Sequence, residues 1–326
     1  MLLYSENQFR SKGETIKYLL RESNNKKLIV IFSGFDTPPK YRYTLTLRGF
    51  DINQLFILDD FKNRGGYYIG QAPKFNFESA TIELIEKIIK EKNIKRSDVI
   101  CAGSSKGGWA ALYYAIKYNF GYSIIGAPQI KIMTYLNFVN YTDVIENMTG
   151  GDKQYVSTVE NHLLDIIEDS KNLPEIFLQI GVGDDHHYYK HILPFIDVIR
   201  KKEYYKNLNL KIENYGSHND VAVYFPRYLC EKIIYIFPSL KQSLFFKKIQ
   251  INQNANMFCI SADANCAEKY AFYVFCDGKL VHTVGYNNSN SLQYTAKTPG
   301  MYKFACFAID NKGNKISNYG KNYEVH

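Results

Sequence analysis

This chain of 326 residues has little tryptophan and no metal-binding cysteine pattern. It has a single tryptophan and six cysteines, none of which forms a C-x-x-C pair or a cysteine–histidine cluster with zinc spacing. We therefore expect no metal site. Cys101 falls in an apolar segment, where a thiol behaves as a small hydrophobic side chain.

Long apolar runs are also missing. No uninterrupted apolar segment is long enough to cross a bilayer, and the first residues lack the basic region and apolar run of a signal peptide. We therefore expect a cytoplasmic protein with reduced thiols and no transmembrane segment. The net charge of +8 is scattered, without a dense basic run, so we expect no nucleic-acid partner. The mild excess of positive charge indicates ordinary solubility, with some attraction for anionic ligands such as a phosphorylated cofactor or an acidic glycan.

What the chain does contain is a short apolar strand, a sharp turn and a helix in direct succession. The strand covers residues 99–102, and Gly103-Ser-Ser-Lys-Gly107 then fits G-x-S-x-G with Ser105 at its centre. The helix is expected from about Gly108. In this context the motif predicts a nucleophile elbow, in which a strained turn lifts the Ser105 hydroxyl clear of the sheet. Ser104 lacks a glycine two residues before it and is the weaker candidate.

Apolar segments alternate with helical patterns over the first three quarters of the chain. We expect strands at 2–4, 15–20, 27–34, 53–60, 99–102, 122–126, 175–181 and 208–215, and helices at 77–92, from about 108, and at 156–169, 188–201 and 220–236. This alternation is typical of an α/β fold with a doubly wound, mainly parallel sheet. It predicts an α/β-hydrolase catalytic domain over residues 1–243.

The pattern changes after Pro238. Short alternating runs appear at 257–261, 270–275, 279–284, 292–294, 302–309 and 319–325, separated by turn signals such as Asp277-Gly278 and Pro299-Gly300. Short strands at this regular spacing predict a small antiparallel β-sandwich over residues 244–326, with an Ig-like arrangement.

The partners of Ser105 are expected at the carboxyl ends of later strands, because α/β-hydrolases follow the chain order serine, acid, histidine. His218 follows the last predicted strand and is the predicted base. Asp184 and Asp185 both follow the strand at 175–181, and the residue pattern leaves open which one is the acid. The other is expected to cap a helix. Asp59 and Asp60, which end an earlier strand, are a remote alternative for the acid. His186, His187 and His191 are expected to line the pocket.

An oxyanion hole needs two backbone N–H groups near the nucleophile. The residue after it, Lys106, supplies the first. The loop after the strand at 27–34 should supply the second, from Phe35 or Gly34. The loop at 64–70, rich in glycine and tyrosine, is either a wall of this site or a plain surface loop.

Several of these segments together resemble a bacterial subfamily of α/β-hydrolases. They are Phe32-Ser-Gly34, Leu58-Asp-Asp60, Gly66-Tyr-Tyr68, Gly103-Ser-Ser-Lys-Gly-Gly108 and Gly126-Ala-Pro-Gln129. The subfamily includes capsular polysaccharide biosynthesis proteins of the XcbB/CpsF type and the glycan-modifying component of the accessory secretion system. The resemblance covers about residues 25–235, and the tail is similar to the three-Y β-sandwich module.

This resemblance implies a serine–acid–histidine triad that O-acetylates a capsular or other surface polysaccharide. It implies acetyl-CoA as co-substrate, with no tightly bound cofactor, and a glycan acceptor as partner. Association with the capsule-synthesis machinery, or with further copies of the chain, is the expected assembly. Two alternatives stay open at this point. One is an esterase or deacetylase with the same triad, and the other is a non-catalytic glycan-binding protein on a hydrolase scaffold.

Overall fold

The computed structural model describes residues 5–325, so the strand predicted at 2–4 lies outside the described residues. The chain forms two compact units, one from Met1–Arg42 and Ile52–Val221 and the other from Tyr43–Asp51 and Ala222–His326. The predicted boundary between residues 243 and 244 marks the change from helices to strands and stays a prediction.

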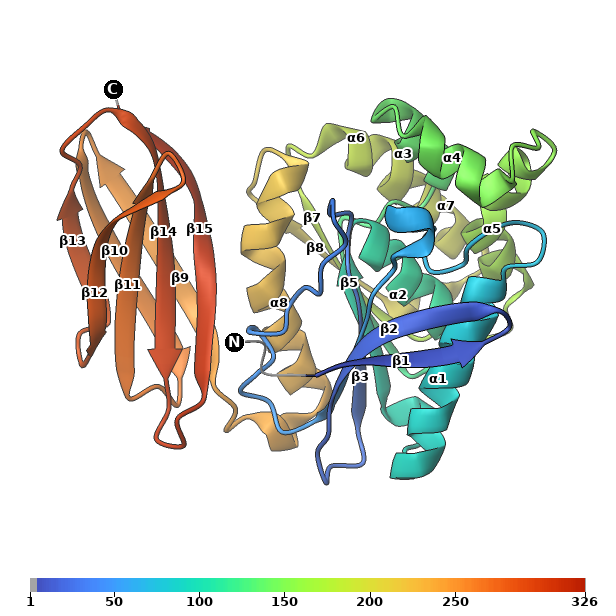
Figure 1. The fold of residues 1–326 in the computed structure, drawn as a ribbon, viewed down its shortest axis with the longest axis horizontal. Coiled ribbons are helices and arrows are strands. Elements are labelled where there is room, and N and C mark those ends of the chain that lie inside the picture. Colours follow the sequence, from blue (N-terminus) through green and yellow to red (C-terminus); the bar gives the residue numbers. More distant parts are fainter. Residues whose placement is uncertain (1–4, 326) are drawn as a thin grey trace. The chain divides into compact units, whose positions relative to one another are not determined.

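The first unit is built on a mixed eight-stranded sheet with the order β1-β2-β4-β3-β5-β6-β7-β8. Figure 1 labels β1, β2, β3, β5, β7 and β8 of this sheet. The strands are β1 (Glu6–Ser11), β2 (Glu14–Arg21), β3 (Leu28–Phe32), β4 (Asn53–Ile57), β5 (Val99–Ser104), β6 (Tyr122–Gly126), β7 (Glu175–Gly181) and β8 (Leu208–Glu213). β1, β2 and β4 pair antiparallel, and all the other neighbours pair parallel. Every residue of β3, β4 and β5 is buried, as their unbroken apolar runs predict.

The helices that the sequence predicts are those in which the apolar spacing continues over several turns. They are α1 (Asn76–Lys92), α2 (Lys106–Lys117), α3 (Ile132–Phe138), α4 (Thr142–Thr149), α5 (Tyr155–Asp169), α6 (Asp185–His187), α7 (Leu193–Lys201) and α8 (Val221–Ile236). The short helices α3 and α4 were not predicted. The helix expected at 188–201 is present, and its first turn, Tyr188–Ile192, is a wider π turn that leads into α7. No helix in the described part of the chain is long and apolar enough to cross a membrane.

The second unit contains α8 and two antiparallel sheets, ordered β13-β10-β9 and β12-β11-β14-β15. Their strands are β9 (Phe245–Asn254), β10 (Met257–Asn265), β11 (Lys269–Cys276), β12 (Lys279–Asn287), β13 (Ser291–Thr295), β14 (Gly300–Ile309) and β15 (Lys315–Val325). Six of these strands were predicted, and β9 was not. Alternate residues of both sheets share one core, in which the rings of Phe258 and Phe304 lie 4.8 Å apart.

The turn between β5 and α2 is the tightest packing point of the first unit. A Cβ atom at Gly107 would lie 2.0 Å from the carbonyl oxygen of Phe32, and one at Gly103 would lie 2.4 Å from the carbonyl oxygen of Gly107. Both contacts are with backbone, which cannot move aside as a flexible side chain could. Only glycine therefore allows β3, β5 and the start of α2 to approach this closely.

We expect Gly107→Ala to lower the free energy of unfolding by about 3 kcal/mol, because the new methyl group overlaps the Phe32 carbonyl. For a unit of this size that is a fall of roughly 6–12 °C in Tm, measurable by calorimetry. Gly216→Ala is the matched control, since nothing lies within 4 Å of the added atom. Equal stability of the two variants would contradict the packing argument.

Candidate functional site

Ser105 occupies the sharp turn between β5 and α2, as the motif predicts. Its backbone has φ 57° and ψ −124°, a conformation that L residues rarely adopt. The Ser105 N–H donates to the carbonyl oxygen of Gly126 at 2.8 Å, which anchors the turn to the end of β6. The strained backbone turns the side chain away from the buried sheet, so that Ser105 is partly exposed between buried neighbours.

His218 and Asp184 lie in hydrogen-bonding series with Ser105. The Nε2 atom of His218 lies 2.9 Å from Ser105 Oγ, and its Nδ1 atom lies 2.9 Å from Asp184 Oδ2. The three residues come from the carboxyl ends of β5, β7 and β8, the edge at which open α/β sheets place their sites. The structure thus brings together three of the residues that the sequence singled out.

Asp185, the other candidate acid, takes no part in this series. It lies in the first turn of α6 and is exposed, whereas Asp184 is 4% exposed. The prediction that the residue other than the acid caps a helix does not hold for Asp185, because Asp185 is the first residue inside α6 and not the residue before it. Asp184 faces His218 because the two loops are joined next to it. The Gly183 N–H donates to the Tyr215 carbonyl and so ties the loop of Asp184 to the loop of His218.

Asp184 serves two imidazoles at once. Its Oδ1 atom lies 2.9 Å from Nδ1 of His187, whose ring stacks on that of His218 with centroids 3.6 Å apart and planes 4° from parallel. Burial alone would raise the pKa of Asp184, but the hydrogen bonds and charges of His187 and His218 outweigh it and hold the pKa well below the ordinary value. Asp184 therefore stays ionised at neutral pH.

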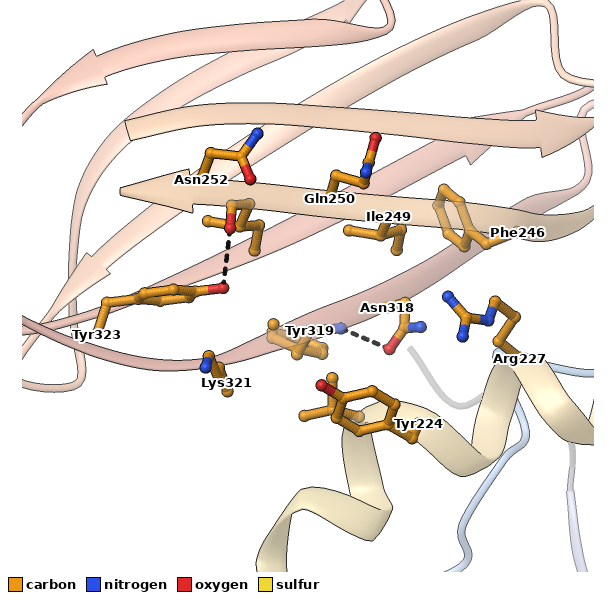
Figure 2. Close-up of a pocket in the computed structure, with 13 residues that line it drawn as sticks. Tyr224, Arg227, Phe246, Ile249, Gln250, Asn252, Asn318, Tyr319, Lys321 and Tyr323 are labelled. Carbon is orange, nitrogen blue, oxygen red and sulfur yellow. Dashed lines mark hydrogen bonds between the residues drawn. The ribbon is translucent and has the colours of Figure 1, made fainter. Parts of the chain in front are cut away.

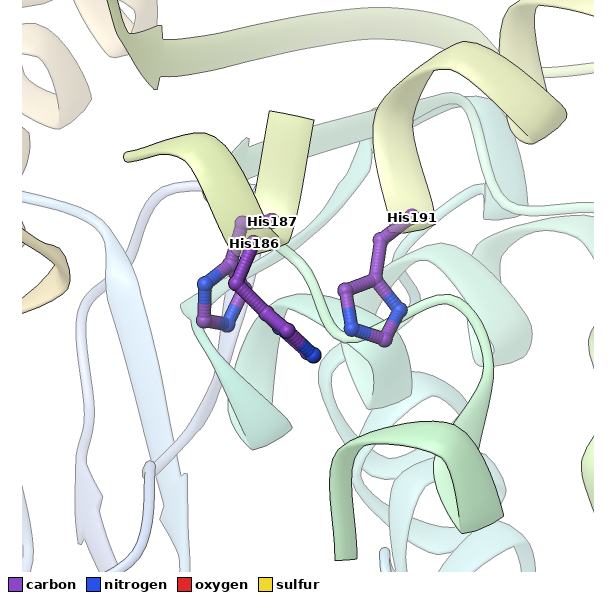
Figure 3. Close-up of side chains that lie close together, drawn as sticks. All are labelled: His186, His187 and His191. Atoms are coloured by element: carbon purple, nitrogen blue, oxygen red, sulfur yellow. The ribbon is translucent and has the colours of Figure 1, made fainter. Parts of the chain in front are cut away.

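Three neighbouring histidines, His186, His187 and His191, form a cluster beside this series (Figure 3). One nitrogen of each lies within 4.8 Å of the others, and each ring has a buried nitrogen without a hydrogen-bond partner among the described residues. Burial, reinforced by the neighbouring imidazoles, lowers the pKa of His187 to about 4 and that of His191 to about 2.

The tautomers of this cluster do not fit a three-histidine metal site. His187 donates Nδ1–H to ionised Asp184, so its Nε2 atom keeps a free lone pair. His191 accepts the backbone N–H of Lys131 at Nδ1, so the neutral ring carries its hydrogen on Nε2 and offers no lone pair there. We therefore interpret the cluster as a neutral, partly buried wall of the site.

Gln129 is the contact of Ser105 that the sequence reasoning missed. Its Nε2 atom donates to Ser105 Oγ at 2.7 Å, and its Oε1 atom accepts from the Tyr67 hydroxyl at 2.6 Å. Both side chains are fully buried. One signal could have found Gln129: it follows β6, the strand next to β5, and so lies at the same edge of the sheet as Ser105.

The residues proposed for the oxyanion hole lie beside the nucleophile. A Cβ atom at Gly34 would lie 3.9 Å from Ser105 Cβ, and Lys106 follows Ser105 as the first residue of α2. The Phe35 ring lies 5.5 Å from the Tyr67 ring. The Lys106 side chain is buried and forms an ion pair with Asp59 at 2.8 Å, so its charge does not face solvent.

The second unit has a cavity of about 290 Å³ between α8 and strands β9 and β15 (Figure 2). Its lining includes Tyr224, Arg227, Gln250, Asn252, Asn318 and Lys321. All of its lining residues belong to the second unit, whereas Ser105, Asp184 and His218 belong to the first.

The depressed histidine pKa values predict loss of stability in acid. Below about pH 6.5 the unfolded chain binds protons at His187 and His191 that the folded chain does not bind until about pH 4 and about pH 2. The free energy of unfolding should therefore fall by about 1.4 kcal/mol per pH unit for each histidine as the pH drops from 6 to 4.5.

Urea denaturation at several pH values tests this with His191→Asn, whose amide oxygen can still accept the Lys131 N–H. We expect a shallower dependence on pH in this variant and an unchanged one in His282→Gln, which alters an exposed histidine of β12. Parallel pH dependences of all three proteins would rule out burial of a neutral His191.

The chain is similar in sequence to an accessory Sec system protein and in structure to a capsule O-acetyltransferase. An accessory Sec system protein of Staphylococcus aureus (strain NCTC 8325 / PS 47) is 28% identical over 123 residues, which are 38% of this chain and only 23% of that protein. The capsule O-acetyltransferase of Neisseria meningitidis serogroup A has a TM-score of 0.59 and 25% identity, covering 72% of this chain and 96% of its own. Another structure of that enzyme is a histidine-to-alanine mutant in complex with CoA. It has a TM-score of 0.56 at 24% identity, and the match covers 70% of this chain and 94% of that one.

Two further structures show the fold alone. The Glycosylation Associate Protein (Gap123) complex from Streptococcus agalactiae has a TM-score of 0.60 at 18% identity, covering 73% of this chain and 47% of that one. A ferulic acid esterase has a TM-score of 0.53 at 13% identity, and the match covers 72% of this chain and 97% of that one. The fold of the first unit is therefore α/β-hydrolase-like.

A match to a known protein family covers most of the first unit. Residues 5–222, two thirds of the chain, match the family described as accessory Sec system GspB-transporter. They include Ser105, Asp184 and His218. The chain therefore belongs to the accessory Sec system GspB-transporter family.

Proposed function

We propose that this protein transfers an acyl group through an acyl-enzyme formed on Ser105, with His218 as base and Asp184 as the acid that orients it. The observation that carries the proposal is the hydrogen-bonded series from Ser105 Oγ through His218 to Asp184, with both distances at 2.9 Å. A serine on a strained turn, an imidazole within reach of its hydroxyl and an ionised carboxylate behind the imidazole are the parts that this chemistry needs.

In the first step His218 Nε2 takes the Ser105 proton as Oγ attacks the acyl carbon. The ionised Asp184 stabilises the imidazolium that forms and keeps its Nδ1–H directed away from the serine. The neutral ring of His187, stacked on His218, adds no competing positive charge there. His218 then gives the proton to the leaving group. In the second half, His218 takes the proton of the acceptor, whose oxygen bonds to the acyl carbon, and passes it to Ser105 Oγ as the Oγ–acyl bond breaks.

Backbone N–H groups of Lys106 and of Gly34 or Phe35 are proposed to hold the oxyanion. The Lys106 N–H begins a helix, where the helix dipole favours negative charge. The close approach of Gly34 to Ser105 supports a second donor from the loop after β3. Loss of one such donor typically lowers the rate by about 10²–10³-fold.

We further propose acetyl-CoA as donor and a capsular or other surface glycan as acceptor, with action in the cytoplasm where acetyl-CoA is made. The capsule O-acetyltransferase with 25% identity, and the CoA bound to its mutant, support both choices. The family membership and the Gap123 complex support association with glycan-related machinery. The XcbB/CpsF-type grouping and the three-Y likeness of the tail remain predictions.

An esterase with the same residues is the second candidate, and the ferulic acid esterase with this fold supports it. A non-catalytic glycan-binding role is the third. The tyrosine, asparagine and glutamine side chains lining the cavity of the second unit support that role (Figure 2), because such side chains suit sugar hydroxyls and rings.

Reaction with a fluorophosphonate probe tests the serine chemistry. We expect labelling of the wild type and none of Ser105→Ala. Asp184→Asn should lower the labelling rate by about 10³–10⁴-fold, since the imidazole loses its orienting carboxylate. Asp185→Asn is the matched control and should label at the wild-type rate, because Asp185 is exposed and outside the series. A folded wild-type chain that is not labelled would favour the glycan-binding role.

Release of CoA from acetyl-CoA, with and without glycan, separates transferase from esterase. Release that requires the glycan, and that places the acetyl group on it, is the result we expect. Cleavage of a simple ester that glycan does not affect would instead identify an esterase.

A further inference from the structure

The hydrogen bonds around Ser105 run in one direction through five side chains. Tyr67 donates to Gln129 Oε1, and Gln129 Nε2 donates to Ser105 Oγ. Oγ then lies within hydrogen-bonding distance of His218 Nε2, whose Nδ1 atom faces Asp184. Since ionised Asp184 can only accept, His218 carries its hydrogen on Nδ1, and the Ser105 hydroxyl must donate to Nε2.

The hydrogen bond that Ser105 donates to His218 determines the orientation of the Gln129 amide. With its hydrogen committed to His218, Ser105 Oγ can only accept from Gln129, so the NH₂ group of Gln129 must face it. The amide oxygen then faces Tyr67, whose hydroxyl has a hydrogen to donate. In the opposite orientation two acceptors would compete for the one Ser105 hydrogen.

The Gln129 contact also determines where Ser105 can attack. A hydroxyl oxygen has one hydrogen and two lone pairs. The hydrogen points to His218 and one lone pair accepts from Gln129, so a single lone pair remains for an acyl carbon. The two partners together therefore fix the rotation of the hydroxyl and the direction of the attacking pair.

The loop that carries Tyr67 is held by a buried carboxylate. Asp59 accepts the backbone N–H of Gly66 at 2.9 Å and that of Tyr68 at 3.1 Å, and it forms the ion pair with Lys106. Tyr67 itself is fully buried with φ 54°, and its ring lies 5.7 Å from the Trp109 ring. The loop at 64–70 is therefore a buried support of the site and not a plain surface loop.

We propose that Gln129 is a further catalytic residue, which donates a hydrogen bond to the nucleophile oxygen, and that Tyr67 is its positioning residue. The inference rests on the proposed function. As the Oγ–H bond breaks and the proton moves to His218, the Gln129 N–H stabilises the negative charge developing on Oγ while the Oγ–acyl bond forms. In the second half, the acceptor hydroxyl gives its proton to His218 while its oxygen bonds to the acyl carbon. The Oγ–acyl bond breaks, the negative charge that develops on Oγ is stabilised by the same N–H, and Oγ takes that proton from His218.

The test measures the second-order rate constant of fluorophosphonate labelling, with kcat and KM for p-nitrophenyl acetate. Gln129→Met keeps the side-chain volume without the donor and should lower labelling and kcat by about 10²-fold with little change in KM. Gln129→Glu keeps the shape and the Tyr67 hydrogen bond but offers Oγ an acceptor, and it should lower the labelling rate and kcat at least as much. Tyr67→Phe should lower both rates about tenfold, the effect of one ordinary hydrogen bond.

Tyr113→Phe is the matched control. It removes a buried hydroxyl that bonds to His162 and Lys117 and has no link to Ser105, so it should keep the wild-type rates. If Gln129 had a purely structural role, Gln129→Glu would stay active. That result, or wild-type labelling of folded Gln129→Met, overturns the inference and leaves the proposed function intact. Absence of Ser105-dependent labelling in the wild type overturns both.

Discussion

The close approach of β3, β5 and α2 is the constraint on which the rest of the site depends. Because Gly107 lies against the Phe32 carbonyl, the chain must leave β5 through a turn that puts Ser105 in a strained conformation. The strain is sustained by the burial of both flanking elements and by the Ser105 N–H bond to Gly126. The position of the hydroxyl is therefore fixed by backbone packing before any side-chain partner is considered.

Electrostatics then separates the roles of similar residues. Four histidines lie near Asp184, and among the described residues His218 is the one whose ring nitrogen lies within hydrogen-bonding distance of Ser105 Oγ. His187 and His191 are buried, and their lowered pKa values keep them neutral at pH 7. A neutral ring stacked on His218 leaves the carboxylate of Asp184 as the charge that decides where an imidazolium can form.

Much of the architecture could be predicted from the sequence, because it depends on periodicity and on a motif with a defined geometry. The buried strands β3, β4 and β5 are continuous apolar runs, and the elbow glycines identified the turn at Ser105. The strand β9 was missed because Lys247 and Lys248 interrupt its alternation. The helices α3 and α4 have too few turns to show a period.

The site was harder to predict where it depends on how a side chain is turned. Choosing between Asp184 and Asp185 requires knowing where a loop bends to within one residue, which residue type does not reveal. The Gln129 amide and the Tyr67 hydroxyl reach Ser105 from two other loops, so no local spacing connects them. For Lys106 the sequence predicted a role of the backbone and gave no sign that its side chain is an ionic partner of Asp59.

The buried pair of Lys106 and Asp59 has an evolutionary consequence. Removing one partner leaves an uncompensated charge in the interior, a penalty of about 3–5 kcal/mol, whereas replacing both by apolar residues can be neutral. Divergence at either position must therefore pass through a nearly unstable intermediate or change both codons together. These two positions, 47 residues apart in the chain, should be inherited as a unit among relatives that keep this loop.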